Sequence, residues 1–562
     1  MTDKPVARGY VAALLDRLVA WQAGLPAESS SYTFQTVKIP LQCEDDVELE
    51  ADLYLSKTAN NQNAAGTLLV QCPYGRSIPM SIFSGSVYAA RGYNVLYVSS
   101  RGTCGSGGKF DPARTDAADG VRVVAWMRKQ PWYTGTFATL GGSYLGYTQW
   151  SLLGSDQPPA DMVAAVIQVG PHDFSHIFWG TGSFWLGSLD WAHMRGIQDS
   201  MSTLQKLWFM YSMKSDGQID VKRSVPLADA AKALLGDTSP WFHEWLTRPD
   251  IEKDEFYKPM KQDEALETTQ VPILLVAGSY DIFLDQTIKQ YQRLSQRGCT
   301  VALTIAPTCH TETQSVSGIA NEAFDWFEKY LGKRGKEKIR PVPVRVNITG
   351  VNEWRWMPIW PPATKPLELF FDSAGQLGKS APQLSDQSEF IFDPHDPTPS
   401  VGGPFLFGGG RVDDTSLSRR RDVLTFTTTP LDCDLEILGR PRIELLHGSD
   451  NPHVDLFVRL SEIDIKGVSH NISQAYRRLD PGRASPGSAV KIELELSDCA
   501  HLFKKGTAVR IYVAGACFPQ YAYNLGSGED QATGTTLKPA KHMIHFGGSD
   551  QSKVILPVSL EQ

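Results

Sequence analysis

Alternation between apolar and polar positions marks a strand near the start of the chain. Val47, Leu49, Ala51, Leu53 and Leu55 alternate with acidic residues, which is the period of a half-buried strand. Continuous apolar runs bounded by Gly or Pro follow, as in buried parallel strands, and they cover 67–71, 94–98, 163–169, 271–277 and 301–305. Helical stretches such as 117–129 lie between these runs, so the pattern predicts an open α/β sheet.

The pattern changes between residues 172 and 262. Apolar runs of strand length disappear there, and helical periodicity takes over, as at 204–213 and 227–235. An even spread of Trp along the chain would place about two in this segment. It holds six of the 14, namely Trp179, Trp185, Trp191, Trp208, Trp241 and Trp245. We interpret the segment as an aromatic-rich helical cap inserted into the α/β domain.

The character changes again after a charged linker at 333–340. Short alternating runs recur between Gly- and Pro-rich turns, and they cover 342–348, 367–371, 423–427, 442–446, 454–459, 490–496, 508–513 and 553–558. This spacing predicts an all-β sandwich of jelly-roll type. The chain is therefore divided into an α/β domain formed by 1–171 and 263–335, a helical cap over 172–262, and a sandwich over 341–562.

Composition and charge limit the classes of partner. Of the 562 residues, 42% are hydrophobic and 21% are charged, which is the composition of a folded globular protein rather than a disordered one. The net charge of −8 disfavours a nucleic-acid partner. The apolar runs fall short of the roughly 18 residues that a membrane helix needs, so we expect no membrane association.

The N-terminal stretch and the cysteines predict a cytoplasmic protein. Asp16 and Arg17 interrupt the apolar stretch at 10–15, which argues against a secretory signal. Helical spacing instead predicts a docked amphipathic helix with an apolar stripe formed by Tyr10, Leu14, Leu18 and Trp21. The eight Cys residues include no C-x-x-C pair, which is typical of reduced thiols rather than a zinc site or a disulfide framework.

The strongest chemical signal is the segment Gly141-Gly142-Ser143-Tyr144-Leu145-Gly146, which joins a short apolar run to a helical stretch. A tight strand-to-helix turn pushes a serine Oγ clear of the sheet and places it near the free amides of a helix N-terminus. Leu145 stands where the G-x-S-x-G pattern has its second Gly, and Gly146 follows one position later. The string alone also fits an ordinary Gly-Ser turn, so its context must decide.

Two later residues supply that context. An α/β-hydrolase presents its catalytic residues in the chain order Ser, acid, His. Asp281 follows the buried run at 271–277, and His310 follows the next run at 301–305. Both are expected at carboxyl ends of strands, where α/β folds build their sites. Asp285 is the rival acid, one helical turn further along the chain.

Several segments together resemble the cocaine esterase / X-prolyl dipeptidyl-peptidase family (CocE/NonD hydrolases). The matching motifs are Gly141-Gly-Ser143-Tyr144-x-Gly146 with Gln149-Trp150, Arg101-Gly102-x-x-Gly105-Ser106-x-Gly108, Gly278-Ser-Tyr280-Asp281, Trp360-Pro361-Pro362, Asp393-Pro-x-Asp396-Pro-x-Pro399-x-x-Gly402-Gly403 and Phe518-Pro519-x-x-x-x-Asn524. They occur in the family's order, whereas residues 1–40 have no obvious counterpart. The resemblance implies an α/β-hydrolase domain with a helical cap insertion and a C-terminal all-β jelly-roll sandwich.

The resemblance also implies a role for each residue of the site. Ser143 corresponds to the nucleophile, His310 to the general base and Asp281 to the acid that orients His310. The hydroxyl of Tyr74, in the segment Cys72-Pro73-Tyr74-Gly75-Arg76, and the backbone N–H of Tyr144 correspond to the oxyanion hole. Such acyl transfer requires no metal and no organic cofactor.

The cap aromatics are the candidates for the acyl pocket. The lining candidates are Phe174, Phe178, Trp179, Phe184 and Trp185, and burial statistics predict that about two-thirds of them pack the cap helices. From these we select Phe174, Trp179 and Trp185 as the residues expected to bind substrate. Family members hydrolyse esters or amides, and the length of the chain, without the long extra N-terminal domain of X-prolyl peptidases, favours a small-molecule ester. The alternatives are X-Pro peptidase or amidase activity, acyl transfer or thioester cleavage by the same triad, and a non-catalytic carbohydrate-binding protein. The sequence also permits a homodimer.

Overall fold

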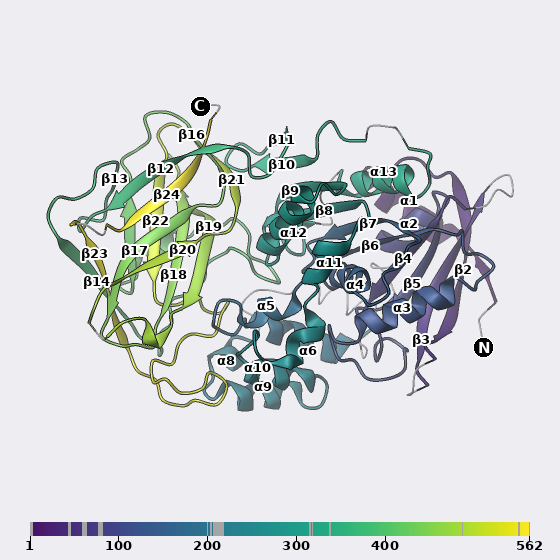
Figure 1. Cartoon of the computed structure of the whole chain (residues 1–562), viewed down its shortest axis with the longest axis horizontal. Coiled ribbons are helices and arrows are strands. Elements are labelled where there is room, and N and C mark those ends of the chain that lie inside the picture. Colours follow the sequence, from purple (N-terminus) through teal and green to yellow (C-terminus); the bar gives the residue numbers. More distant parts are fainter. Residues whose placement is uncertain are drawn as a thin grey trace.

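The computed structural model describes residues 4–42, 46–58, 64–76, 82–198, 201–202, 205, 218–313, 316, 318–335, 339–485, 487–548 and 551–560. These residues form a mixed β-sheet with helices on both faces, a group of cap helices, and a C-terminal region built from two further sheets. In Figure 1 the C-terminal sheets lie on the left, the mixed sheet lies on the right, and the cap helices lie below and between them.

The mixed sheet carries the candidate site. Its strands from β5 to β10 in sheet order run parallel, and their carboxyl ends therefore share one edge. In sheet order the strands are β1 (Val6–Ala7), β2 (Ser30–Pro40), β3 (Glu48–Thr58), β5 (Asn94–Ser99), β4 (Thr67–Cys72), β6 (Phe137–Gly142), β7 (Met162–Gln168), β8 (Ile273–Tyr280), β9 (Val301–Cys309), β10 (Val344–Ile348) and β11 (Glu353–Met357).

Helices cover both faces of this sheet, which is why its parallel strands are apolar without alternation. One hydrophobic core lies between the sheet and α3 (Asp116–Met127), α4 (Tyr144–Leu153), α11 (Asp263–Thr268) and α12 (Leu284–Gln296). A second core lies against η1 (Ile82–Ser86), α1 (Tyr10–Gln22), α2 (Val87–Ala89) and α13 (Ile319–Tyr330). The predicted α/β-hydrolase architecture is confirmed in this part of the chain.

The cap follows β7 and consists of helices in the described residues. They are α5 (Phe174–Trp179), α6 (Gly187–Gln198), α8 (Ile219–Arg223), α9 (Leu227–Leu235), α10 (Trp241–Thr247) and the 3₁₀ helix η2 (Glu255–Met260). The helix predicted at 227–235 is present as α9. The helix predicted at 204–213 lies outside the described residues, apart from Gln205.

The C-terminal region is all-β, as the sequence predicts. One sheet contains β12 (Thr364–Phe371), β13 (Leu377–Gly378), β14 (Asp386–Phe392), β16 (Leu435–Gly439), β17 (Arg442–Ser449), β20 (Val490–Glu495), β21 (Cys499–Phe503), β23 (Ala540–Phe546) and β24 (Lys553–Ser559). The facing sheet contains β15 (Val423–Thr427), β18 (Asp455–Ile463), β19 (Ser469–Arg478) and β22 (Ala508–Ala514). The short helices η4 (Thr415–Arg419) and η5 (Pro481–Arg483) lie in its loops.

Backbone hydrogen bonds join this sandwich to the cap. The N–H of Leu186 donates to the carbonyl of Gln520 at 3.0 Å, and the N–H of Ala522 donates to the carbonyl of Phe184 at 2.8 Å. Trp185 and Tyr521 form an antiparallel bridge between these two bonds. The sandwich is thus fixed to the segment that leads into α6.

The strand predicted at 342–348 forms, but in a different sheet. β10 pairs in parallel with β9, with Val344 opposite Leu303, and β11 turns back against β10. The prediction that all residues from 341 onward belong to the sandwich is therefore wrong for these two strands. An alternating strand fits either sheet, and its partner is selected by packing rather than by its own pattern.

The N-terminal helix α1 also forms, but it docks by the opposite face. Tyr10 and Trp21 are 91% and 77% exposed, and Leu14 and Leu18 are exposed as well. The buried residues are Asp16 and Ala20. The Asp16 carboxylate determines this orientation, because it accepts hydrogen bonds from Arg8, Tyr32 and Ser86 at 2.9, 2.9 and 2.5 Å, and a buried carboxylate needs such partners.

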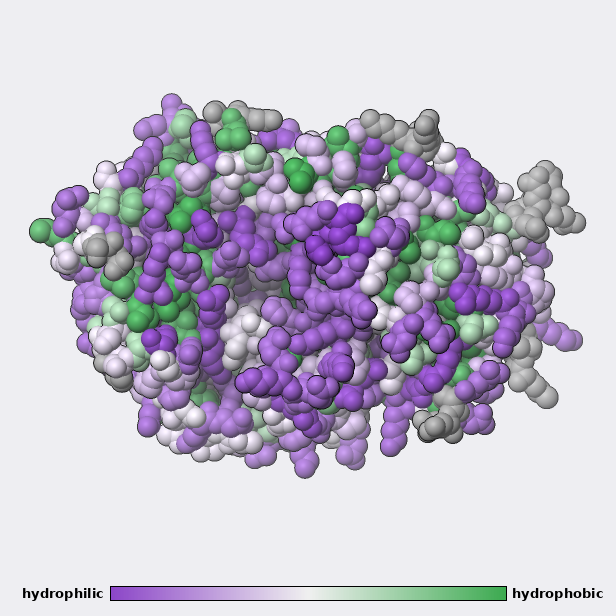
Figure 2. Space-filling model, viewed as in Figure 1, coloured by the Kyte–Doolittle hydropathy of each residue, from purple (hydrophilic) through white to green (hydrophobic). Residues whose placement is uncertain are grey.

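The surface is mostly polar on the face drawn in Figure 2, and the described cysteines form no disulfide bonds. Figure 2 shows a mostly hydrophilic face with apolar residues scattered over it. No helix in the described part of the chain combines the length and apolarity needed to cross a membrane. The seven described cysteines are free thiols.

Candidate active site

Ser143 occupies a strained turn between β6 and α4. It follows the last residue of β6 directly and precedes the first residue of α4, with φ +59° and ψ −124°. A non-glycine residue adopts this region only when the surrounding structure enforces it. The turn projects the serine side chain from the carboxyl edge of the sheet, as a nucleophile elbow does.

Close contacts explain the glycine pattern around the turn. A Cβ at Gly141 would lie 2.3 Å from the Cβ of Leu145, and a Cβ at Gly146 would lie 2.8 Å from the Cα of Gly170. The second position that must lack a Cβ is therefore Gly146, where the helix backbone passes close to Gly170. This is why Leu145 is tolerated at the position where G-x-S-x-G has Gly. Buried Gln149 braces the turn, because its Nε2 donates to the carbonyls of Gly141, Leu145 and Val166 at 3.2, 3.0 and 3.1 Å.

His310 and Asp281 complete a hydrogen-bonded chain with Ser143. The Oγ of Ser143 lies 2.9 Å from Nε2 of His310, and Nδ1 of His310 lies 2.6 Å from Oδ2 of Asp281. Asp281 directly follows β8, and His310 directly follows β9. Both are buried, and the N–H of Phe283 holds the other carboxylate oxygen of Asp281 at 2.6 Å.

The rival carboxylate lies elsewhere. Asp285 is on α12, where it pairs with Arg440 at 3.1 Å and accepts a hydrogen bond from Ser497 at 3.2 Å. It thus contacts the sandwich instead of His310. The structure brings Asp281, and not Asp285, to the histidine.

Tyr74 and Tyr144 both lie next to the serine, Tyr74 across the cavity lining and Tyr144 as the next residue of the chain. Tyr74 follows β4 and lines the same cavity as Ser143. Burial raises the pKa of the Tyr74 phenol to about 12, so the hydroxyl keeps its proton and can donate it in a hydrogen bond. Tyr144 is the first residue of α4, and its backbone N–H therefore has no acceptor inside the helix.

The side chain of Tyr144 is anchored away from the cavity. Its hydroxyl donates to Oδ2 of Asp116 at 2.7 Å and accepts from the N–H of Ala113 at 2.7 Å. Burial, opposed by the hydrogen bond from Tyr144 and assisted by the nearby charge of Asp119, raises the pKa of Asp116 to about 7. This buried carboxyl group lies behind the first turn of α4.

The cavity at Ser143 is small and apolar. Its volume is about 20 Å³, little more than the ~10–15 Å³ that one water molecule requires. Three parts of the chain contribute to it, because its lining residues are Tyr74, Ser143, Phe174, Ile177, Phe178, Trp185, Ser188, Trp191, Trp245, Ile282, Phe283 and Leu406.

The predicted substrate-binding aromatics are only partly brought to this cavity. Phe174 and Trp185 line it, as expected. Trp179 does not: its indole N–H donates to the carbonyl of Trp245 at 2.8 Å, and its ring packs against Phe184, so it belongs to the core of the cap. Four further lining residues were not predicted from the sequence, namely Trp191, Trp245, Phe283 and Leu406. For Phe283, its place two residues after Asp281 was an available signal.

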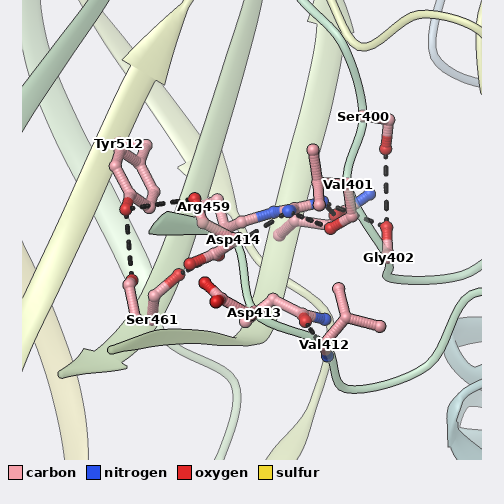
Figure 3. Close-up of polar contacts among 12 residues, drawn as sticks. Ser400, Val401, Gly402, Val412, Asp413, Asp414, Arg459, Ser461 and Tyr512 are labelled. Atoms are coloured by element: carbon pink, nitrogen blue, oxygen red, sulfur yellow. Dashed lines mark hydrogen bonds and ion pairs between the residues drawn. The ribbon is translucent and has the colours of Figure 1, made fainter. Parts of the chain in front are cut away.

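Leu406 reaches the cavity from the sandwich, on a loop that a buried arginine holds. Arg459 of β18 has a fully buried side chain and donates to the carbonyls of Val401 and Gly402 at 2.5 and 3.2 Å (Figure 3). Oδ2 of Asp414, which is also buried, lies 3.7 Å from Nη1 of Arg459, and the two side chains form an ion pair. These contacts fix the start of the loop that carries Leu406.

The Gly-rich motif of this loop has a steric reason. Gly403 has φ +93°, and a Cβ there would lie 2.7 Å from Oε1 of Gln474, the side chain that also accepts a bond from Arg459 at 2.6 Å. Gly403 and Gly410 exchange two backbone hydrogen bonds of 2.8 and 2.9 Å, which close the loop. Among the described residues, we find no cluster of His, Cys, Asp or Glu that could hold a metal ion.

Family models match both halves of the chain. Residues 45–312 match X-Pro dipeptidyl-peptidase (S15 family), and residues 336–555 match the X-Pro dipeptidyl-peptidase C-terminal non-catalytic domain. Cocaine esterase from Rhodococcus sp. (strain MB1 Bresler) is 24% identical over 594 residues, which covers 93% of this chain and 98% of that protein. A protein of Mycobacterium bovis, named as a serine esterase, is 23% identical over 573 residues, which covers 85% of this chain and 90% of that protein.

Solved structures share the whole fold. An aminopeptidase from the marine sediment archaeon Thaumarchaeota archaeon has a TM-score of 0.79 at 20% identity and covers 94% of this chain and 96% of that one. An α-amino acid ester hydrolase has a TM-score of 0.76 at 21% identity, covering 95% and 98%. A CocE/NonD family hydrolase from Staphylococcus aureus has a TM-score of 0.68 at 17% identity, covering 94% of each chain. The chain is thus a serine hydrolase in which an X-Pro dipeptidyl-peptidase (S15 family) domain is followed by the C-terminal non-catalytic domain of X-Pro dipeptidyl-peptidases, and its structural neighbours include CocE/NonD hydrolases, as the motifs predicted.

Proposed function

We propose that the protein hydrolyses carboxylic esters through an acyl-enzyme on Ser143. The observation that carries this proposal is the hydrogen-bonded chain from Ser143 to His310 at 2.9 Å and on to Asp281 at 2.6 Å. A serine hydroxyl is a weak nucleophile unless an adjacent base takes its proton. The buried carboxylate holds the imidazole in the tautomer that accepts this proton and stabilises the imidazolium that results.

In the proposed reaction, each step is assigned to a named residue. Ser143 Oγ attacks the ester carbonyl while its proton passes to Nε2 of His310, and the carbonyl oxygen becomes negative. The hydroxyl of Tyr74 and the backbone N–H of Tyr144 donate hydrogen bonds to this oxyanion. The C–O bond to the alcohol breaks as His310 returns the proton to the leaving oxygen. Water, activated by His310, then cleaves the acyl-enzyme and releases the acid.

The cavity favours a short, uncharged acyl group. Its volume of about 20 Å³ leaves little room beside Ser143, and the described residues that line it include no Asp or Glu. A substrate with an α-ammonium group would therefore lack a carboxylate partner among these residues, which favours a simple ester over an amino-acid ester or a peptide. Amide or X-Pro peptide cleavage, acyl transfer and thioester cleavage by the same triad are the competing functions.

A fluorophosphonate probe tests the nucleophile. We expect the wild type and Ser151→Ala to be labelled, because Ser151 is buried on α4 and bonds to the carbonyl of Thr148. Ser143→Ala should not be labelled. Labelling that is independent of Ser143 would overturn the proposal.

A substrate series tests the specificity. p-Nitrophenyl esters from acetate to octanoate should show kcat/KM falling by at least about 10-fold with chain length, since each misfitted methylene costs about 1–3 kcal/mol of discrimination. X-Pro-p-nitroanilides should be slower than the acetate ester. Faster cleavage of the anilides would replace the esterase proposal with the peptidase alternative.

A further inference from the structure

The cap helix α6 bonds to Tyr74 through two residues on one face, and a third residue supports one of them. Nε1 of Trp191 donates to the Tyr74 hydroxyl at 3.0 Å, and Nε2 of Gln198 donates to the Tyr74 backbone carbonyl. Arg195 lies between them and donates to Oε1 of Gln198 at 2.6 Å. Positions 191, 195 and 198 are spaced by four and three residues, so they project from the same side of the helix.

The same indole also contacts the other candidate oxyanion donor. The rings of Trp191 and Tyr144 are stacked, with centroids 5.9 Å apart and planes at 12°. On its other sides Trp191 packs against Trp241 at 5.1 Å and Trp245 at 5.9 Å, so its position is fixed by the aromatic core of the cap. One side chain thus bonds to Tyr74 and stacks on the ring of Tyr144, whose backbone N–H is the other candidate oxyanion donor.

Within the hydrolase domain, the Tyr74 ring packs against the core of the mixed sheet and its hydroxyl interacts with Ser143. Tyr74 lies in a loop after β4, and its N–H bonds to Sγ of Cys72 at 3.3 Å, a weak acceptor. A phenol hydroxyl rotates about its C–O bond unless a partner fixes it. When the oxygen accepts the Trp191 N–H, its own proton is free to point to a substrate oxygen, and a hydroxyl that accepts one hydrogen bond becomes a better donor.

We propose that Trp191 is a positioning residue for the oxyanion hole, so that the cap takes part in transition-state stabilisation as well as in shaping the pocket. This inference rests on the proposed function, because it assigns Trp191 an effect that passes through the Tyr74 hydroxyl. The indole N–H orients that hydroxyl before the substrate arrives, and preorganised donors stabilise developing charge without reorganisation during the reaction.

A double-mutant cycle tests the proposal. Trp191→Phe keeps an aromatic ring and removes the N–H. With p-nitrophenyl acetate we expect kcat to fall about 10-fold while KM changes less than about twofold, because only a transition-state interaction is lost. In the Tyr74→Phe background, the same substitution should lower kcat less than about twofold, since the hydroxyl it positions is already absent.

Trp245→Phe is the matched control. Trp245 lines the same cavity and stacks on Trp191, but its indole nitrogen is buried without a hydrogen-bond partner. Its substitution removes the same atoms without breaking a bond to Tyr74. Whatever its effect on kcat, we expect that effect to be equal in the wild-type and Tyr74→Phe backgrounds.

The outcomes separate this inference from the proposed function. If wild type is labelled at Ser143 and hydrolyses the ester, but Trp191→Phe lowers kcat equally with and without the Tyr74 hydroxyl, the positioning role is overturned alone. A rise in KM with unchanged kcat would also overturn it, in favour of a pocket-shaping role. If the wild type shows no Ser143-dependent labelling, the proposed function fails and the inference fails with it.

Discussion

Two parts of the site are built differently: the carboxyl edge of the parallel sheet, and the wall of the cavity, which we define as its lining residues from the cap and the sandwich. Ser143, Asp281 and His310 each directly follow the last residue of a strand, β6, β8 and β9. The wall is assembled from parts that are distant in the chain, with Trp191 from the cap and Leu406 from a loop of the sandwich. In the proposed reaction, the edge presents the reactive groups, and the wall bounds the space that the substrate can enter.

This difference has an energetic consequence. Neighbouring parallel strands are held in register by backbone hydrogen bonds, so residues one step beyond their ends have little freedom to separate. The wall depends on side-chain packing and on the buried pair of Arg459 and Asp414. Substitutions at the edge should therefore lower the rate with every substrate. Substitutions in the wall should change stability and the preference among substrates, except at Trp191, which also bonds to Tyr74.

The largest effect is expected at Asp281. Asp281→Asn keeps the shape of the side chain but no longer stabilises the tautomer of His310 that accepts the Ser143 proton, so kcat should fall by about 10⁴-fold with all esters. Steady-state rates on the acetate and butyrate esters measure this. Asp285→Asn, at the rival carboxylate, should leave kcat unchanged, and an equal loss in both variants would contradict the assignment.

Tyr74 belongs to both parts, because it follows a strand of the sheet and also lines the cavity. Its substitution tests whether it acts as a reactive group of the edge. Tyr74→Phe removes one oxyanion donor, and kcat should fall by about 10²–10³-fold while the protein stays folded and labelled by a fluorophosphonate. Tyr133→Phe, which removes a hydroxyl bonded to Asp161 at 2.6 Å, is the control and should retain full activity. Full turnover in Tyr74→Phe would remove this residue from the mechanism.

Arg459 tests how the wall is held. Arg459→Met leaves Asp414 buried without its ionic partner, which should lower the free energy of unfolding by about 3–5 kcal/mol in urea titrations. Because the loop that carries Leu406 loses its anchor, the ratio of butyrate to acetate kcat/KM should also rise severalfold. Arg128→Met is the control: it breaks the exposed ion pair of Arg128 with Asp161, and it should lower the free energy of unfolding by less than about 1 kcal/mol. Equal stability of the two variants would show that the buried pair does not hold the wall.

Asp116 gives the smallest expected effect on turnover and a distinct pH signature. Its folded-state pKa of about 7 lies above the value in an unfolded chain, so the unfolded state releases the proton first as pH rises. The stability contribution of this group is complete below about pH 4 and is lost as pH rises to 7, by about 1.4 kcal/mol per pH unit. Asp116→Asn should remove this dependence while kcat changes less than about threefold. The pH profile of unfolding, compared with that of wild type, measures it, and parallel profiles would contradict the assignment.

Local patterns predicted the elements and the residues at the sheet edge. The apolar runs at 271–277 and 301–305 indicated buried strands. Asp281 and His310 stand just after these runs in the order Ser, acid, His, and their place at the strand ends favoured Asp281 over Asp285. The turn at Ser143 was visible because glycines must stand where Cβ atoms would collide. These features are decided within a few residues of the chain, and a single sequence therefore reveals them.

Other features could not be obtained in this way. Trp179 and Trp191 are the same residue type on neighbouring cap helices, yet the first packs against Phe184 and the second bonds to Tyr74. Helical periodicity on α1 selected the face that is in fact exposed, because the buried Asp16 has partners from three other segments. In both cases the outcome depends on partners far away in the chain.

The sequence by itself determined the α/β, cap and sandwich organisation and the three residues at the strand ends, because hydrophobic period and turn chemistry are local properties. Only the tertiary structure decided that β10 joins the hydrolase sheet, that Leu406 of the sandwich reaches the cavity, and that Trp191 bonds to Tyr74. These contacts join segments that are separated by many residues, and they form because burial and hydrogen bonding are satisfied across the whole fold.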